Sequence, residues 1–131
     1  MNSYVKELKQ IEQIRKLRVN HFRRKQGLVA AERNQASRQI EQAELDYQRT
    51  EVELVQEQRE QLQSLTQASS VKSHQVQAYT KLQLKGVKQI KDAMQEIEKS
   101  RSNLKEVNKR LIESTAELNK AEKKLIGLQE V

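Results

Sequence analysis

The side chains that could take part in catalysis are few and isolated from one another. His21 and His74 are the two histidines, and both stand among polar neighbours. The sequence has no cysteine, no glycine-rich phosphate loop and no pair of histidines at zinc-ligand spacing. Acid pairs such as Glu96 and Glu98 are typical of a helix surface rather than of two carboxylates in one pocket. We therefore expect no catalytic residue, metal site or cofactor, and we predict that the chain is not an enzyme by itself.

Positive charge is the chemical property that the sequence concentrates. The formal net charge is +7, and residues 1–25 hold eight basic and two acidic residues. Such an excess is compatible with a solvated helix face, an acidic protein partner or a nucleic-acid backbone. Nucleic acid is the weakest of the three, because aromatic residues that could stack on bases make up only 3% of the chain. We call residues 1–25 the basic arm. Its candidate partner-binding residues are Arg15, Lys16, Arg18, Arg23, Arg24 and Lys25.

The composition favours long helices over a globular core. Hydrophobic residues make up 35% of the 131 residues, which is too little to fill the interior of an ordinary domain. Proline, which would interrupt a helix, is absent, and Glu, Lys, Gln, Arg, Leu and Ala are strong helix formers. No apolar run approaches the roughly 20 residues that a membrane-spanning helix needs, and the first residues lack the apolar segment of a secretory signal. We expect an all-α protein without a transmembrane segment.

The second half of the chain carries an unbroken heptad pattern. A large aliphatic residue recurs every seven residues, and a mostly smaller side chain follows three residues later, from Ala93 to Leu128. This alternation is the seam of a coiled coil, and its small residues favour two closely approaching helices. The expected core residues are Ile90, Ile97, Leu104, Leu111, Leu118 and Leu125, and the seam is expected to extend backwards through Val76, Tyr79, Gln83 and Gly86.

The first half carries a matching seam, which supplies the partner helix. Its clearest stretch is Val29, Arg33, Ala36, Ile40, Ala43, Tyr47, Thr50 and Leu54, of which Ile40, Tyr47 and Leu54 are the large core residues. After Leu54 we expect a four-residue stutter, continued by Val55, Gln58, Leu62 and Leu65. Near the N-terminus the apolar face is wider than a two-helix seam needs, which indicates a further neighbour or an exposed apolar surface. The additional residues are Ile11, Ile14, Leu17 and Leu28.

A serine-rich stretch between the two seams predicts a turn. Serine side chains compete for backbone hydrogen bonds, and Ser73 is the expected N-cap of the second helix. We therefore predict a single domain over residues 1–131, an all-α antiparallel coiled-coil hairpin of two long helices. The first helix should cover about 3–66, the turn about 67–73 and the second helix about 74–129.

The distribution of charge supports the same topology. Residues 41–60 hold seven acids and two bases, whereas residues 72–91 hold five bases and no acid. Folding at the turn would bring Glu57 near Lys81, Glu53 near Lys85, and Glu51 near Lys88. Opposite flanking charges select the orientation of coiled-coil helices. They favour a monomeric hairpin over a parallel homodimer.

These features resemble those of the FliJ/YscO (SctO) family, the central stalk proteins of bacterial type III secretion systems. The resemblance covers nearly the whole chain. It rests on the short, Gln-rich sequence without Cys or Pro, on the hairpin pattern, and on an arm with Leu8, Ile11, Arg15 and Arg18 followed by Arg23-Arg24. A protein of this family has no enzymatic activity of its own. It lies in the bacterial cytoplasm, at the cytoplasmic base of the secretion apparatus.

The resemblance implies partners for both ends of the hairpin. The terminal end would insert into the pore of a hexameric secretion ATPase and stimulate it, with the six basic residues named above facing acidic loops. The turn would reach the export gate through Gln67, Ser69, Ser70, Val71, Lys72 and Ser73, and secretion chaperones are possible further partners. The alternatives are a generic coiled-coil adaptor and a nucleic-acid-binding helical arm. If the chain binds nucleic acid, we expect the binding to be without sequence preference.

Overall fold

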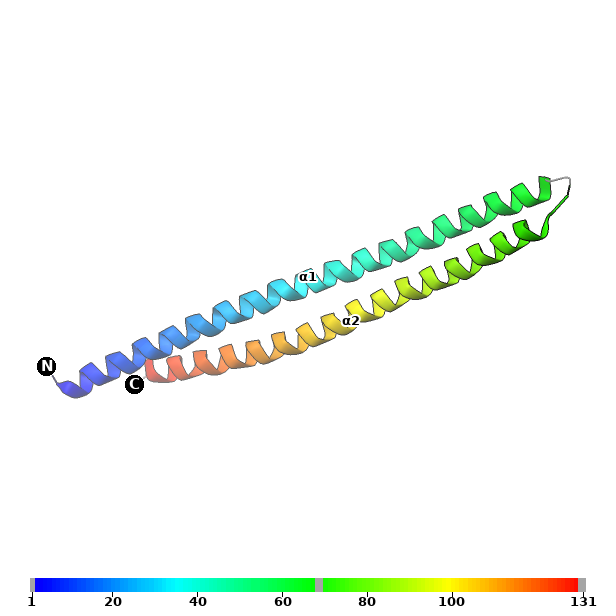
Figure 1. Ribbon diagram of the computed structural model, residues 1–131. Helices are drawn as coiled ribbons and strands as arrows, with labels where there is room; N and C mark the ends of the chain where they lie inside the picture. The colour runs from blue at the N-terminus through cyan, green and yellow to red at the C-terminus, as the bar shows by residue number, and fades with distance from the viewer. Residues whose placement is uncertain (1, 68–69, 130–131) are drawn as a thin grey trace. The chain divides into compact units, whose positions relative to one another are not determined.

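The protein folds as an all-α hairpin of two long helices, which confirms the predicted fold class. The computed structural model describes residues 2–67 and 70–129. Helix α1 spans Ser3–Gln67 and helix α2 spans Ser73–Gln129, so the helices end within one residue of the predicted bounds. The two helices pack against each other in antiparallel directions (Figure 1). None of the described helices is long and apolar enough to cross a membrane.

Each helix begins at a residue that satisfies free backbone N–H groups. Asn2 caps α1, because its carbonyl accepts hydrogen bonds from the N–H groups of Val5 and Lys6, and its side chain accepts one from Tyr4. At α2 the predicted N-cap, Ser73, is wrong. The carbonyl of Lys72 accepts the first bonds of the helix, and its N–H donates to Oε1 of Gln75 at 2.9 Å. This is half of a capping box, with Ser73 as the first helical residue.

The hairpin divides into two compact units. Unit 1 comprises residues 1–37 and 103–131, and unit 2 comprises residues 38–102. Unit 1 therefore joins the N-terminal part of α1 to the C-terminal part of α2, and unit 2 contains the loop between the helices. Each unit is described by itself below.

In unit 1 the core is a narrow seam between the helices. Val19, Leu118 and Ala121 form a buried cluster, against which Phe22 and Leu125 pack. Polar pairs bridge the helices beside it: Gln26 Nε2 donates to Thr115 Oγ1 at 2.9 Å, and Arg110 forms an ion pair with Glu32 at 2.8 Å. Val29, Ala36, Val107 and Ser114 are also buried in this unit.

In unit 2 large side chains of one helix lie opposite small ones of the other. Leu54 packs so closely on Gly86 that a Cβ added to Gly86 would lie 3.1 Å from Cδ2 of Leu54. Reflection about this contact places Ile40 opposite Ser100, Ala43 opposite Ile97, and Tyr47 opposite Ala93. Ala43 and Ser100 are buried as a result. The small seam positions allow the close approach of two helices that the heptads predicted.

The large seam residues are covered to different extents. Leu54 and Leu118 are buried, and the other seven predicted core residues are half-buried: Ile40, Tyr47, Ile90, Ile97, Leu104, Leu111 and Leu125. Two helices cover only one side of each other, so that no large side chain of the described residues is fully enclosed. The structure therefore has its deepest burial at small residues such as Ala36, Val107 and Ser114.

The expected seam between Leu54 and the loop is wrong in part. Val55, Leu62, Val76 and Gln83, which were expected in the seam, are exposed. The half-buried residues are instead Gln58, Gln61 and Leu65 on α1, and Gln75, Tyr79 and Leu82 on α2. Two successive four-residue steps, from Thr50 to Leu54 and from Leu54 to Gln58, form the stutter, and α2 has a matching one centred on Gly86. The stutters meet at the Leu54–Gly86 contact.

The ion pairs expected from the charge pattern do not form. Among the described residues of unit 2, the ion pair between the helices is Arg101–Glu44, at 3.4 Å, and none joins Glu57 to Lys81, Glu53 to Lys85, or Glu51 to Lys88. Two residues at the same height along the helices form an ion pair only if both side chains also face the partner helix. Lys88 comes two residues after Gly86 and therefore lies on the far side of α2, since each residue turns a helix by about 100°.

Candidate functional site

A basic groove in unit 1 is the candidate functional site. It has a volume of about 300 Å³ and is lined by seven residues from both helices. Helix α1 contributes Arg15, Arg18 and Phe22, and helix α2 contributes Glu117, Lys120, Ala121 and Lys124. Four of the seven side chains are cationic and one is anionic.

The floor of the basic groove is apolar and belongs to the core of unit 1. Ala121 is buried with Val19 and Leu118, and Phe22 packs against this cluster. The ring of Phe22 also meets that of His21 edge to face, with centroids 5.3 Å apart. Because the floor is continuous with the helix seam, a ligand would meet a preformed surface.

The cations on the two walls are held in different ways. Arg15 is half-buried, and its Nη1 donates a hydrogen bond to the backbone carbonyl of Lys124 at 2.8 Å. Arg18 lies one turn further along α1 and is exposed, and among the described residues it forms no hydrogen bond or ion pair with α2. Arg15 therefore ties α1 to α2, whereas Arg18, Lys120 and Lys124 keep their charges available to a ligand.

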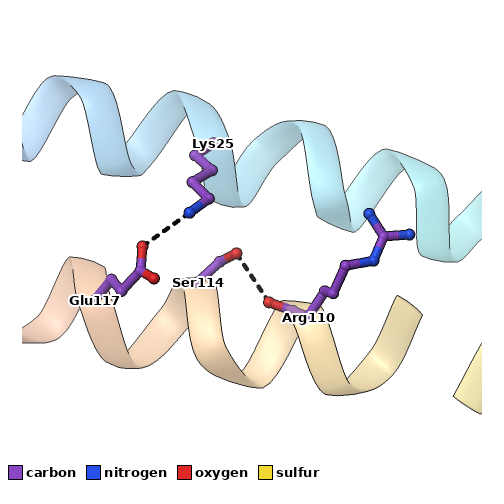
Figure 2. Close-up of polar contacts among 4 residues, drawn as sticks. All are labelled: Lys25, Arg110, Ser114 and Glu117. Atoms are coloured by element: carbon purple, nitrogen blue, oxygen red, sulfur yellow. Dashed lines mark hydrogen bonds and ion pairs between the residues drawn. The ribbon is translucent and has the colours of Figure 1, made fainter. Parts of the chain in front are cut away.

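The acidic residue of the basic groove is already paired. Lys25 Nζ of α1 lies 3.1 Å from Glu117 Oε2 of α2, and Figure 2 shows this contact crossing between the helices. One turn before Glu117, the hydroxyl of Ser114 donates to the carbonyl of Arg110 at 2.9 Å, which satisfies a buried polar group. Since Lys25 balances Glu117, the groove carries the charge of its four bases.

The predicted partner-binding residues are not all brought together. Arg15 and Arg18 line the basic groove, and Lys25 reaches its acid. Lys16 pairs with Glu12 on its own helix at 3.1 Å, Arg24 Nε donates to the carbonyl of Asn20, and Arg23 pairs with Glu122 at 3.4 Å. The C-terminal part of α2 thus neutralises part of the charge of residues 1–25, through Glu117 and Glu122.

Sequence reasoning missed the wall that α2 contributes. Lys120 and Lys124 line the basic groove, but they stand in a C-terminal segment with as many acids as bases. Their four-residue spacing places them on one face of the helix. That spacing was the available signal, and it gains meaning only once the antiparallel register puts this face beside Arg15 and Arg18.

An exposed apolar ledge borders the basic groove on α1. Ile11 and Ile14 are 41% and 51% exposed, and each precedes a groove arginine by four residues. Residues four apart are neighbours on a helix surface. Leu17 and Leu28 are exposed as well. The wide apolar face that the sequence predicted is therefore exposed surface, not a second internal seam.

The predicted gate-contacting residues occupy the loop of unit 2. Gln67 is the last residue of α1, and Ser73 is the first of α2. Ser70, Val71 and Lys72 are exposed between them, with Val71 at 51%. Ser69 lies outside the described residues. Three exposed residues of mixed character provide a small contact surface.

The described residues contain no group of three or more His, Cys, Asp or Glu side chains that could hold a metal ion. His21 and His74 are both exposed. Comparisons with protein-family models, with curated proteins and with solved structures found no match. The features that bear on function are therefore the helical hairpin and the chemistry of the basic groove.

Proposed function

We propose that the chain is a non-enzymatic coiled-coil stalk, which links and stimulates a hexameric type III secretion ATPase and contacts the export gate. The observation that carries the proposal is the basic groove of unit 1. An acidic loop of the ATPase would bind there, as the resemblance to the FliJ/YscO family implies.

The composition of the basic groove supports an acidic protein partner. Arg18, Lys120 and Lys124 supply charge for carboxylates, and the guanidinium of an arginine can bind one in bidentate fashion. The floor of Phe22 and Ala121, with the ledge of Ile11 and Ile14, supplies apolar area that a purely electrostatic site does not need. A mixed apolar and cationic surface is typical of protein interfaces.

A charge-reversal variant tests the basic groove. Arg18→Glu, Lys120→Glu and Lys124→Glu together should lower both binding and stimulation of the ATPase by about tenfold or more. Arg15 is left unchanged because it binds the backbone of α2. The matched control carries the same charge change at exposed lysines outside the groove: Lys99→Glu, Lys105→Glu and Lys109→Glu.

The measurements are a pull-down and an ATPase assay with the hexamer. Both variants should keep the circular dichroism and melting of the wild type, because exposed charges contribute little to folding. Equal stimulation by the wild type and a well-folded groove variant would contradict the proposal. Tight binding of RNA at physiological salt by the wild type, lost in the groove variant, would favour the helical-arm alternative.

The loop of unit 2 is proposed as the contact for the export gate. Its support is the exposure of Ser70, Val71 and Lys72. Val71→Glu combined with Lys72→Glu should weaken binding to the cytoplasmic part of a gate protein while leaving ATPase stimulation unchanged. Loss of stimulation in this variant, or unchanged gate binding, would contradict the assignment of the two surfaces.

A further inference from the structure

Unit 2 exposes an apolar face along both of its helices. We call it the outer apolar face, and its residues are between 44% and 68% exposed. It consists of Val55 and Leu62 on α1, and of Val76, Val87 and Met94 on α2. Exposed apolar residues gathered on one side of a fold mark an interaction site more often than single scattered residues do.

The outer apolar face lies on one side of the helix pair. Val55 directly follows Leu54, and Val87 directly follows Gly86, so each is turned by about 100° from the seam. In an antiparallel pair of right-handed helices, a step forward in sequence turns towards the same side on both helices. Each of the five residues directly follows an inward-facing residue, and they therefore share that side.

The opposite side of unit 2 is charged. Residues that directly precede an inward-facing residue include Glu53, Glu57 and Glu60 on α1, and Lys81 and Lys85 on α2, all of them exposed. Because charged side chains are well hydrated, this side can remain exposed to solvent. The contrast between the two sides shows that the outer apolar face is not a general property of the helices.

The seam beneath the outer apolar face is itself poor in aliphatic residues. Gln58, Gln61 and Gln75 occupy inward positions, and Oε1 of Gln61 is buried without a hydrogen-bond partner in the described structure. Between Leu54 and the loop, Val55, Leu62 and Val76 thus lie outside the seam while three glutamines lie within it. Covering these aliphatic residues would bury apolar surface that the two helices leave exposed.

We propose that a second copy of this chain covers the outer apolar face and forms an antiparallel four-helix assembly. We place the two-fold axis at Val55. A residue that stands a given number of positions before Val55 in one copy then lies opposite the residue that stands the same number of positions after Val55 in the other copy. Val55 then meets itself, and on α2, where the axis passes near Lys85, Val76 meets Met94. An isologous contact of this kind needs a self-complementary surface, which this face provides.

Charge supports the same register. Glu51 and Arg59 flank a hollow that Val52 and Val55 line, and neither forms an ion pair among the described residues. They stand equally far before and after Val55. The two-fold axis therefore brings Glu51 of each copy to Arg59 of the other, giving two equivalent pairs. The sequence predicts a monomer, because the acidic residues 41–60 are expected to pair with the basic residues 72–91 of the same chain. The expected ion pairs between these segments do not form in the structure.

The proposal is independent of the basic groove, because it uses residues of unit 2 alone. The absence of cysteine provides a direct test. In Val55→Cys the added thiols of two copies meet on the axis, and mild oxidation should crosslink most of the chain. The matched control, Glu57→Cys, is on the charged side and should crosslink only slowly. Equal crosslinking of the two variants would overturn the proposed register.

Charge exchange gives a second test, read by sedimentation of the full chain over about a hundredfold range of concentration. Glu51→Arg alone and Arg59→Glu alone should each weaken the dimer about tenfold, since each loses two pairs and gains two repulsions. The double variant restores both pairs and should recover most of the affinity. A wild type that stays monomeric throughout, or that binds lipid vesicles in place of a second copy, would overturn the proposal.

Discussion

Gly86→Ala tests the contact between Gly86 and Leu54 in unit 2. Inside a helix, Ala is more favourable than Gly by up to about 1 kcal/mol, because Gly loses more backbone entropy on folding. At position 86, however, the added Cβ would lie 3.1 Å from Cδ2 and 3.5 Å from Cδ1 of Leu54. Gly27 is the matched control, since it also lies inside a helix and an added Cβ there meets nothing within 4 Å.

The expected magnitudes follow from these distances. Gly27→Ala should raise the free energy of unfolding by about 0.5–1 kcal/mol. At Gly86 this gain is offset by crowding, which costs about 1–3 kcal/mol in a packed site, so that Gly86→Ala should be neutral or destabilising. Leu54→Ala removes the crowding atoms. In that background Gly86→Ala should be stabilising, with a coupling energy between the two positions of about 1–2 kcal/mol.

The assay is urea unfolding followed by far-ultraviolet circular dichroism, for the wild type, the three single variants and the double variant. An unchanged dependence on urea would show that the variants differ in stability and not in the extent of unfolding. Equal stabilisation by Gly27→Ala and Gly86→Ala would refute the reasoning. It would mean that Leu54 moves aside freely and that the two stutters do not fix the register of unit 2.

Three further predictions use the same urea assay. Gln61→Leu should stabilise the fold by about 1–2 kcal/mol, because a buried Oε1 without a partner is replaced by an apolar group; a loss of stability would mean that this oxygen is hydrated. Ser114→Leu should destabilise by about 1–3 kcal/mol through overpacking of a buried small position, whereas Ser114→Ala should be nearly neutral; equal effects would contradict the close approach there. Lys25→Met should cost less than about 1 kcal/mol, since its pair with Glu117 is half-exposed; a larger loss would assign Lys25 a structural role.

Much of the fold follows from periodicity. The heptads from Ile90 to Leu125 extend over most of α2. A pattern of this length predicts an α-helix and identifies the face of the helix that is buried. The absence of proline and the serine cluster at the turn then determine the number of helices and their connection. The N-cap at Lys72 could not be predicted from the sequence, because Ser73 has the better capping side chain. In the structure the side chain of Gln75 accepts a hydrogen bond from the Lys72 N–H and stabilises the start of the helix one residue earlier.

Two of the four cationic residues of the basic groove could be predicted from the sequence. Arg15 and Arg18 belong to a segment in which basic residues accumulate, and a count of charges finds them. Lys120 and Lys124 belong to a segment of balanced charge, and only their position across the seam makes them part of the site. A count of charges also cannot tell that Arg23 is paired with Glu122.

The seam near the loop illustrates why local pattern was insufficient. Between Leu54 and Gln67, α1 presents aliphatic residues at Val55 and Leu62 and glutamines at Gln58 and Gln61, so that hydrophobicity alone favours turning the aliphatic residues inwards. Their outward position follows from the rest of the helix. The long seam fixes the rotation of α1 as far as Leu54, and the matched stutters at Leu54 and Gly86 carry that rotation past the contact. To bring Val55 and Leu62 inwards, α1 would have to turn away from a seam of many heptads.

Near the loop, aliphatic residues are therefore exposed while glutamines lie in the seam, which lowers the stability of unit 2 in a single chain. The proposed assembly would offset this loss. A second copy that covers Val55 and Val87 would stabilise the folded hairpin by mass action, so that the midpoint of unfolding should rise with protein concentration. Gln61→Leu strengthens the seam without touching the outer apolar face, and it should raise the midpoint equally at all concentrations. Val87→Glu should instead remove the concentration dependence while leaving the stability at low concentration nearly unchanged. A midpoint that is independent of concentration in the wild type would mean that the hairpin tolerates its outer apolar face uncovered, and the second copy would have no part in its stability.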